Sequence, residues 1–282
     1  MPVSPLPRVM IEAQVRDALI EDLGRAGDIT SDAIIPAATK AETALIARKP
    51  GVVAGLDVAL LAFELIDPAI KAGVAKPDGS RLETGDLIAT IAGPARGILT
   101  AERVALNFLC HLSGIASATA AVVDAVKGTK ARVICTRKTL PGLRNLQKYA
   151  IRVGGGFNHR YGLDDAVLIK DNHIAAAGGI RQAVERVRGA IGHLIKIELE
   201  VDTLEQLEEG LAVGVDAILL DNMDVEAMRR AVGIVNGRAV TEASGGITPQ
   251  TAPAIAATGV DLLSLGWLTH SVQQLDIGLD WR

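Results

Sequence analysis

From residue 131 onward the chain repeats one pattern, a short apolar run that ends on a charged or small residue. The runs end at Lys138, Lys170, Glu200, Asp221, Glu242 and Gly266, and the last four ends are 21 to 24 residues apart. That spacing accommodates one strand, one loop and one helix. The segments 180–188, 203–211 and 225–232 between the runs have helical periodicity, and Thr203 with Gln206 has the form of a capping box. Six strands with crossover helices predict a parallel α/β barrel rather than an open sheet. The absence of a G-x-G-x-x-G motif after the first strand also counts against a dinucleotide-binding sheet.

The N-terminal part of the chain has a different texture. Residues 9–23 place apolar side chains at helical spacing before Gly24, and residues 28–31 form a turn or a new helix N-cap. Short strands and one or two helices follow over residues 41–97, which predicts an α+β domain with a structural or dimer-forming role. A long Ala-rich helix is predicted over residues 99–127, with Thr100 as its N-cap and Ser113-Gly114 as a point where it kinks or splits.

We therefore expect two domains. An α+β sandwich domain spans residues 1–107 and an α/β barrel spans residues 108–270, with the tail 271–282 free to pack back on the first domain. The size of the chain, 282 residues with 49% hydrophobic content, is sufficient for this arrangement.

Charge and cysteine content narrow the class of protein. The chain has 29 basic and 33 acidic residues, a formal net charge of −4, which argues against nucleic acid or an anionic membrane as its main partner. Cys110 and Cys135 form no metal-binding spacing, as expected in a reducing cytosol. The start, MPVSPLPRVM, has no apolar signal region, and we find no uninterrupted stretch of membrane-spanning length. These features predict a soluble cytoplasmic protein.

Cations are concentrated in residues 132–172, although the chain as a whole is slightly acidic. The carboxyl ends of barrel strands meet at one mouth, so the topology brings together the cations near the first two strand ends: Arg137, Lys138, His159, Arg160 and Lys170. Guanidinium groups pair with carboxylates in a bidentate way. This arrangement predicts an anionic small molecule, in particular a dicarboxylate.

The ends of the next strands carry acidic and small residues that complement these cations. Glu200 and Asp221 are a carboxylate pair suited to Mg²⁺, to sugar hydroxyls or to a developing positive charge. The loops Ser244-Gly245-Gly246 and Leu265-Gly266-Trp267 allow backbone N–H groups to approach a phosphate, as late barrel loops often do. A phosphorylated sugar that meets an organic acid would satisfy all three parts of the mouth.

Each part also has a simpler interpretation. A strand-end lysine can merely pair with Asp171 or Glu200, Ser244-Gly245-Gly246 can be only a turn, and Arg103 can be an ordinary surface charge. His111 is expected to be a packed or partly exposed helix residue and not a ligand. Two other classes of function are alternatives: a Schiff-base lyase that uses Lys138 or Lys170, and a catalytically silent barrel that acts as a scaffold.

The chain resembles nicotinate-nucleotide pyrophosphorylase (carboxylating), also called quinolinate phosphoribosyltransferase, over nearly its whole length. The resemblance lies in these motifs: Gly27-Asp28-Ile29-Thr30, Thr100-Ala101-Glu102-Arg103, Thr136-Arg137-Lys138-Thr139, Pro141-Gly142-Leu143-Arg144, Gly154-Gly155, Asn158-His159-Arg160, Lys170-Asp171-Asn172-His173, Glu198–Asp202, Leu220-Asp221-Asn222-Met223, Glu242–Ile247 and Leu268-Thr269-His270-Ser271. It implies an open barrel of six or seven strands and a homodimer, or a higher oligomer. It also implies conversion of quinolinate and phosphoribosyl pyrophosphate, with Mg²⁺, to nicotinate mononucleotide, pyrophosphate and carbon dioxide in NAD biosynthesis.

The resemblance also implies roles for single residues. The quinolinate group comprises Thr136, Arg137, Lys138, His159, Arg160, Lys170, and Arg103 from the neighbouring subunit. Glu200 and Asp221 would serve the ribose and Mg²⁺, and residues 244–246 and 265–267 would hold the 5′-phosphate. Lys138, Lys170, Glu200 and Asp221 are the expected catalytic residues.

Three positions depart from the pattern of the family. Trp267 replaces a residue that is usually small, Phe157 replaces a frequent histidine, and Gln147 replaces a frequent acid. The closest rival interpretation is a paralogous phosphoribosyltransferase of the same fold that acts on another aromatic acid. The combination of Arg137-Lys138, His159-Arg160 and Lys170 favours quinolinate.

Overall fold

The computed structural model describes residues 3–282 and contains two compact units. The N-terminal unit consists of the chain up to Ala120 together with Thr139–Gly155 and Leu268–Arg282, and the barrel unit consists of Ala121–Lys138 and Gly156–Trp267. The domain boundary predicted at residue 107 falls inside a helix, α4 (Ala95–Ala125). Residues 1 and 2 of the N-terminal stretch, where no signal region was predicted, lie outside the described residues.

The barrel unit contains the predicted six-stranded parallel sheet. Its strands are β6 (Arg132–Ile134), β7 (Val167–Ile169), β8 (Ile197–Val201), β9 (Ala217–Asp221), β10 (Val240–Ser244) and β11 (Leu262–Ser264). They are ordered β6-β11-β10-β9-β8-β7, and every neighbouring pair is parallel. β6 and β7 are the two edges, so the barrel is open. The expected fold, an open α/β barrel beside an α+β unit, is confirmed.

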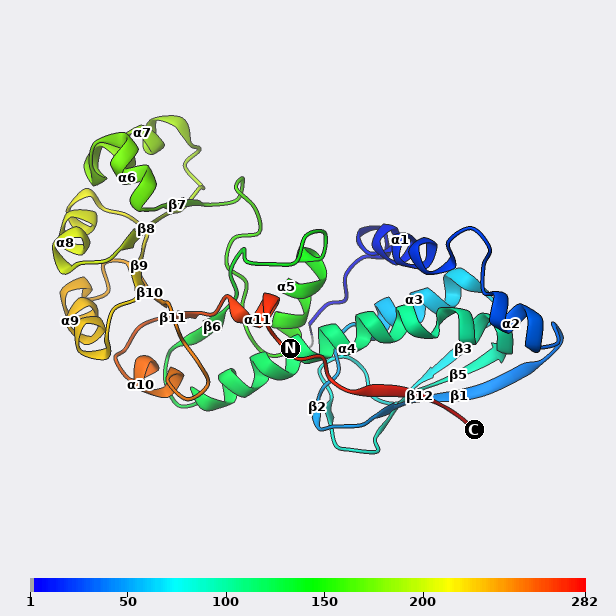
Figure 1. The fold of residues 1–282 in the computed structure, drawn as a ribbon. Coiled ribbons are helices and arrows are strands. Elements are labelled where there is room, and N and C mark those ends of the chain that lie inside the picture. Colours follow the sequence, from blue (N-terminus) through cyan, green and yellow to red (C-terminus); the bar gives the residue numbers. More distant parts are fainter. Residues whose placement is uncertain (1–2) are drawn as a thin grey trace. The chain divides into compact units, whose positions relative to one another are not determined.

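Helices follow the barrel strands in turn. They are α6 (Asp171–Ala177), α7 (Ile180–Ala190), α8 (Leu204–Val213), α9 (Val225–Val235), α10 (Ala252–Ala256) and α11 (Trp267–His270). Figure 1 shows α8, α9 and α10 on the outer side of the arc of strands. The Thr203 hydroxyl accepts the backbone N–H of Gln206 at 3.3 Å, so the predicted N-cap of α8 is confirmed.

Alternation along the strands decides which side chains face away from these helices. In β8 the apolar Ile197, Leu199 and Val201 are buried, while Glu198 and Glu200 point to the opposite face. The register aligns Glu200 and Glu242 with the same residue of β9, Leu219, and aligns Asp221 with Ser244. Acidic and hydroxyl side chains therefore share one face of the sheet, together with the apolar Leu219 of β9.

The N-terminal unit is built on a four-stranded antiparallel sheet in the order β12-β1-β5-β3. Its strands are β1 (Lys40–Ala47), β3 (Lys71–Val74), β5 (Leu87–Pro94) and β12 (Ile277–Trp281), and β2 (Gly51–Val52) with β4 (Arg81–Leu82) forms a separate ribbon. The C-terminal segment is thus the edge strand beside β1. Figure 1 shows α3 (Leu56–Ile66) and α4 along one side of the sheet.

The remaining helices of this unit are η1 (Arg8–Met10), α1 (Glu12–Leu23), α2 (Ile29–Ile34) and α5 (Arg144–Val153). Gly55 has a φ of +84° at the start of α3, and a Cβ there would lie 2.4 Å from Leu112 Cδ1. Only glycine allows α3 to begin so close to α4.

The long helix α4 corrects three sequence predictions. It begins at Ala95, so Thr100 is not its N-cap and instead donates its hydroxyl to Asp28 at 3.0 Å. It continues without a break through Ser113-Gly114, where the Ser113 hydroxyl bonds the backbone of Ala54. It also meets the length and composition of a membrane span, although 61% of its most apolar window is buried in the structure.

Candidate active site

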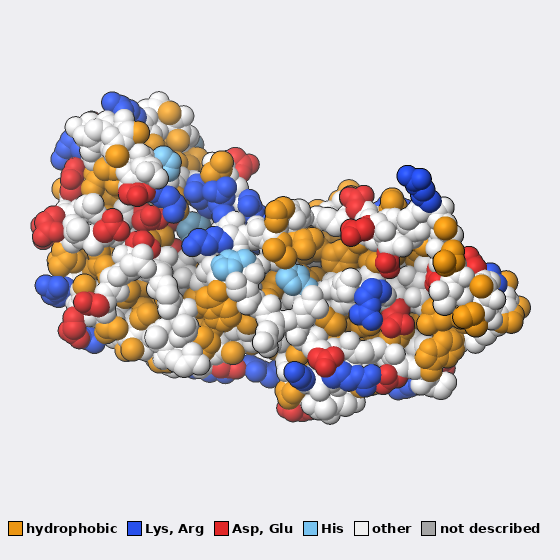
Figure 2. All heavy atoms as spheres, in the orientation of Figure 1, with side chains coloured by type: hydrophobic (Ala, Val, Ile, Leu, Met, Phe, Trp, Pro, Cys, Tyr) orange, Lys and Arg blue, Asp and Glu red, His pale blue; other side chains and the backbone are white. Residues whose placement is uncertain are grey.

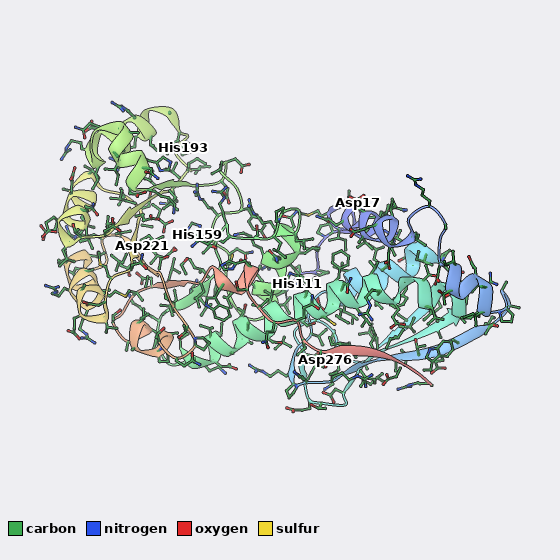
Figure 3. All side chains as sticks on the ribbon, viewed as in Figure 1. Asp17, His111, His159, His193, Asp221 and Asp276 are labelled. Carbon is green, nitrogen blue, oxygen red and sulfur yellow. The ribbon has the colours of Figure 1, made fainter. Side chains whose placement is uncertain are left out.

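Nearly all of the residues predicted for the site belong to the barrel unit. Lys170 follows β7 directly, Glu200 lies in β8, Asp221 ends β9 and Ser244 ends β10. Parallel strands place these carboxyl ends on one edge of the sheet. Figure 2 shows basic and acidic side chains gathered together on this face of the barrel unit, and Figure 3 shows His159 and Asp221 on the inner side of the strands.

Arg137 and Arg160 form the cationic part of the site. Both are half-buried, and Arg160 donates from Nη1 to the Ala166 carbonyl at 2.9 Å. Burial lowers the pKa of the Arg160 guanidinium, and the positive charge of Arg137 lowers it further. Since an arginine stays charged in proteins, this neighbourhood holds two like charges together, which an anionic ligand would stabilise.

His159 is held deeper in the barrel by two carboxylates. Its Nε2 atom lies 2.9 Å from Glu198 Oε2 and 3.7 Å from Glu242 Oε2, while Nδ1 lies 2.7 Å from the backbone nitrogen of Arg160. Glu198 is 9% exposed and Glu242 only 1% exposed. Burial raises the pKa of Glu242 well above its ordinary value, and the nearby charge of Glu198 raises it further.

Sequence reasoning assigned no role to Glu198 or to the side chain of Glu242. The signal was present in the alternation of Ile197-Glu198-Leu199-Glu200-Val201, which puts Glu198 on the same face as Glu200. A cavity of about 410 Å³ reaches all three members of this cluster, and it is otherwise lined mainly by residues at the beginnings of the strands.

Lys170 and Glu200 form an ion pair, with Lys170 Nζ 2.9 Å from Glu200 Oε2. The simpler interpretation of a strand-end lysine, that it pairs with Glu200, therefore describes this structure. Lys170 is 47% exposed and Glu200 is 16% exposed, so the lysine can exchange this partner for a ligand at little cost. The backbone N–H of Lys170 donates to His173 Nδ1 at 3.0 Å and so fixes the start of α6.

The loops after β9 and β10 depend on glycine. Gly245 has a φ of +98°, and a Cβ at this position would lie 2.1 Å from Asn222 Oδ1. Asn222 itself has a φ of +52°, donates its backbone N–H to Ser244 O at 3.0 Å and donates its side-chain amide to Asp221 at 2.7 Å. The two loops are thereby locked together, and Gly246, with a φ of +59°, extends the turn.

Trp267 joins this arrangement. Its indole Nε1 donates to the Ile247 carbonyl at 2.8 Å, which ties the loop after β11 to the loop after β10. The departure from the small residue usual in the family thus has a structural role. Thr136 shapes the loop after β6, because its hydroxyl accepts the backbone N–H of Lys138 at 3.0 Å, and the Lys138 side chain is exposed.

Other predicted cations lie outside the barrel unit. Arg103 is exposed on α4 of the N-terminal unit. Arg144, Lys148 and Arg152 lie on α5 in that same unit, and Lys148 is completely buried. The dense cationic stretch seen in the sequence is therefore divided between the two units.

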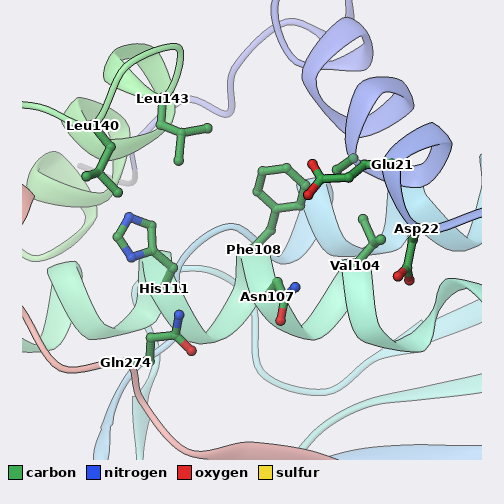
Figure 4. Close-up of a pocket in the computed structure, with 10 residues that line it drawn as sticks. Glu21, Asp22, Val104, Asn107, Phe108, His111, Leu140, Leu143 and Gln274 are labelled. Atoms are coloured by element: carbon green, nitrogen blue, oxygen red, sulfur yellow. The ribbon is translucent and has the colours of Figure 1, made fainter. Parts of the chain in front are cut away.

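The N-terminal unit has a cavity of its own, of about 390 Å³. Figure 4 shows it between α1, α4 and the segment before α5, with His111 at one end. His111 Nε2 lies 2.9 Å from the side-chain amide of Gln147, and burial lowers the pKa of its imidazole. The expectation that His111 is a packed or partly exposed helix residue agrees with this geometry.

Comparisons with known proteins agree with the geometry of the barrel mouth. The N-terminal domain profile of quinolinate phosphoribosyl transferase matches residues 28–113, and the C-terminal domain profile matches residues 115–280. The nicotinate-nucleotide pyrophosphorylase [carboxylating] of Mycobacterium leprae is 51% identical over 94% of this chain and 95% of its own length. The probable enzyme of that name from Bacillus subtilis is 44% identical over 93% of this chain and 90% of its own length.

Solved structures give the same result for the fold. The crystal structure of NadC from Streptococcus pyogenes superposes with a TM-score of 0.95, at 42% identity and 99% coverage of both chains. The nicotinate-nucleotide pyrophosphorylase from Francisella tularensis also reaches a TM-score of 0.95, at 36% identity, over 100% of this chain and 99% of its own. This chain belongs to the quinolinate phosphoribosyltransferase family, the carboxylating nicotinate-nucleotide pyrophosphorylases.

Proposed function

We propose that this protein transfers the phosphoribosyl group of phosphoribosyl pyrophosphate to quinolinate and releases carbon dioxide and pyrophosphate. The product is nicotinate mononucleotide, a precursor in de novo NAD biosynthesis. One observation supports this most directly. Two half-buried arginines, Arg137 and Arg160, share a neighbourhood in the barrel unit, which also carries the carboxylates Glu200 and Asp221 near the ends of β8 and β9. An acid with two carboxylates fits the first group, and a ribose fits the second.

The arginines and lysines have different roles in binding quinolinate. Arg137 and Arg160 present guanidinium forks to its carboxylates, and Lys138 and Lys170 add positive charge from exposed positions. Lys170 reaches the acid by leaving Glu200, with which it pairs in this structure. Thr136 supports this group of cations through its hydrogen bond to the Lys138 backbone, and the family resemblance adds His159 to the group.

The ribose phosphate occupies the other side of the mouth. Gly245 and Gly246 have the positive φ angles that turn backbone N–H groups toward a ligand, beside Ser244. The second loop, Leu265 to Trp267, is fixed to the first by the Trp267 indole. We assign the 5′-phosphate to these two loops.

The reaction then proceeds without a covalent enzyme intermediate. The pyridine nitrogen attacks the anomeric carbon while pyrophosphate leaves, and Glu200 and Asp221 stabilise the cation-like transition state. The bond between C2 and its carboxylate next breaks to release carbon dioxide. The electron pair stays on C2, where the adjacent positively charged, ribosylated nitrogen stabilises it, and a proton from water then binds C2 to complete nicotinate mononucleotide. Lys138 and Lys170 steady the charge on the carboxylates during this step.

Glu200 and Asp221 are also the residues that would hold Mg²⁺. Two carboxylates at the ends of adjacent strands are a donor set that Mg²⁺ uses together with substrate oxygens. The ion would neutralise charge on the leaving pyrophosphate. Since Glu200 pairs with Lys170, displacement of the lysine by quinolinate would free the carboxylate for this role.

The assembly and location follow the same argument. We propose a homodimer in which Arg103 of one subunit completes the quinolinate site of the other, because Arg103 is an exposed cation far along the chain from the barrel strands. Higher oligomers built from that dimer are compatible with it. A cytoplasmic location fits two cysteines that form no disulfide in the structure.

The test is a substrate comparison. The purified protein is mixed with Mg²⁺ and phosphoribosyl pyrophosphate, and with quinolinate, nicotinate or nicotinamide. Of the three acids and amides tested, only quinolinate should give both nicotinate mononucleotide and carbon dioxide. Turnover of nicotinate with quinolinate inert would make the protein a paralogous transferase of the same fold. Borohydride trapping of a substrate on a lysine would instead indicate a Schiff-base reaction.

A further inference from the structure

Two buried carboxylates inside the barrel have no part in the reaction described above. Glu198 and Glu242 lie on the face of the sheet that carries Glu200 and Asp221, but deeper than either. Their Oε2 atoms lie 2.9 Å and 3.7 Å from His159 Nε2, and Glu242 Oε1 has no hydrogen-bond partner among residues 3–282. Burying two acids without a function would only destabilise the barrel.

The hydrogen bonds of His159 determine which ring nitrogen carries the proton. The backbone N–H of Arg160 can only donate, and it lies 2.7 Å from Nδ1, so Nδ1 must be the unprotonated acceptor. The proton of a neutral imidazole is then on Nε2, which donates to Glu198. A doubly protonated ring would direct two N–H groups at one another across 2.7 Å.

This protonation state argues against a metal ion in the same cluster. His159, Glu198 and Glu242 present ligand atoms within 4.8 Å of one another, which is a suitable size for a metal site. A metal on Nε2, however, requires a lone pair there and a proton on Nδ1 that a neighbouring group accepts. The group beside Nδ1 is a donor, so the geometry is the reverse of what a metal ligand needs.

We propose that Glu198 is a positioning residue that acts through His159 on Arg160. Glu198 accepts the Nε2 proton and thereby holds the ring, whose Nδ1 fixes the backbone of Arg160 and hence the starting point of its guanidinium. In this arrangement both ring nitrogens have partners inside the barrel, so His159 also supports the quinolinate site through the backbone of Arg160. This inference rests on the proposed function of Arg160.

Glu242 completes the arrangement as a neutral neighbour. Burial and the nearby charge of Glu198 raise the pKa of Glu242 well above its ordinary value, which favours the neutral form of this carboxyl. The Ser264 hydroxyl and Glu198 both interact with it. The negative charge of Glu198 favours the charged form of the Arg160 guanidinium. Glu198 therefore interacts with Arg160 electrostatically as well as through His159.

Variants of Glu198 separate positioning from a general structural role. Glu198→Gln keeps an oxygen that can accept the Nε2 proton, whereas Glu198→Ala does not. We expect Glu198→Ala to raise the KM for quinolinate about tenfold, with the KM for phosphoribosyl pyrophosphate within about twofold of the wild type. Glu198→Gln should rescue the quinolinate KM to within about threefold, and Glu226→Ala, on the exposed face of α9, is the matched surface control.

Two results would overturn the proposal. If Glu198→Gln were as damaging as Glu198→Ala, a charged partner would be required and His159 would be an imidazolium. If both KM values and the thermal midpoint changed together, Glu198 would act only on stability.

The protonation state can also be measured without any turnover. A two-bond ¹⁵N–¹H correlation spectrum of ¹⁵N-histidine protein reports it for each of the five histidines, and His159→Asn identifies the His159 signals. We expect an unprotonated Nδ1 and a protonated Nε2, both unchanged when benzene-1,2-dicarboxylate saturates the site. A doubly protonated ring, or a change on saturation, would contradict the proposal, while absence of quinolinate turnover would contradict only the proposed function.

Discussion

At the scale of single residues, Arg160 connects the buried cluster of His159, Glu198 and Glu242 to the proposed quinolinate site. Its backbone N–H is held by His159, its guanidinium bonds the Ala166 carbonyl, and the charge of Arg137 is close enough to lower its pKa. A guanidinium fork of this kind is suited to a carboxylate.

Removal of this side chain should therefore act on one substrate. Arg160→Ala should raise the KM for quinolinate about 10- to 100-fold, because a charge-assisted hydrogen bond contributes roughly 1.5–3 kcal/mol. Arg160→Lys should give an intermediate value, because an ammonium lacks the bidentate fork. Steady-state kinetics with each substrate varied in turn provides the measurement, and Arg229→Ala on exposed α9 is the control. An unchanged quinolinate KM in Arg160→Ala would remove this residue from the site.

A second prediction at this scale concerns Gly245. Its φ of +98° and the 2.1 Å approach of Asn222 Oδ1 to a Cβ mean that Gly245→Ala should cost about 1–3 kcal/mol in the free energy of unfolding. The KM for phosphoribosyl pyrophosphate should rise as well, because the turn beside the phosphate would shift. Gly233 offers the matched control: it lies in α9 with ordinary φ and open space, so Gly233→Ala should stabilise by about 0.5–1 kcal/mol. Urea denaturation of both variants distinguishes the two cases.

At the scale of secondary-structure elements, Asp28 joins α2 to α4. One carboxylate oxygen accepts the Ser31 backbone N–H at 2.9 Å as the N-cap of α2, and the other accepts the Thr100 hydroxyl at 3.0 Å. The hydrogen bonds from Ser31, and then that from Thr100, lower the pKa of Asp28 below 3.8.

The sign of the pH effect follows from that direction. A carboxyl whose pKa is lower in the folded than in the unfolded state stabilises fully above its unfolded pKa, and the stabilisation is lost as pH falls through the folded value. Asp28→Ala should cost about 1 kcal/mol at neutral pH, as the loss of an N-cap usually does. The difference from the wild type should shrink in acid, and Asp28→Asn, which keeps an acceptor oxygen, should behave more like the wild type. A deficit that stays constant down to strongly acidic pH would contradict this account.

The same scale shows what sequence patterns could and could not predict. The barrel strands are short apolar runs with regular spacing, and the predicted helices between them were found. Helix α5 was missed because its buried face includes Gln147 and Lys148, which hydrophobic periodicity does not count. Strand β3 was missed because all four of its residues are exposed at the edge of the sheet.

Within the site, motifs identified residues but not their partners. Sequence could place Lys170 and Glu200 on neighbouring strand ends, yet their ion pair depends on the register between β7 and β8. Likewise, the hydrogen bond from the Trp267 indole to the Ile247 carbonyl joins two loops that are separated by a helix and a strand in the sequence. Such contacts are tertiary, and no local pattern encodes them.

At the scale of the whole molecule, the site residues are distributed between two units. The barrel unit contains the residues proposed to bind quinolinate, ribose and phosphate, whereas Arg103 is an exposed residue of the N-terminal unit. Under the proposed dimer, each active site would combine the barrel of one subunit with Arg103 of the other. A closed two-fold dimer then contains two equivalent mixed sites.

Mixing two inactive variants tests this arrangement. Arg103→Ala and Lys170→Ala should each lose most activity with quinolinate as homodimers, while both remain dimeric by light scattering. When equal amounts exchange subunits, about half of the dimers are hybrids, and each hybrid has one site free of both substitutions and one site with both. Activity should therefore recover to about a quarter of the wild type, because one site in two is intact in half of the dimers. Recovery requires that Arg103 act across the interface; if each subunit used its own Arg103, every hybrid site would carry one substitution and no activity would return.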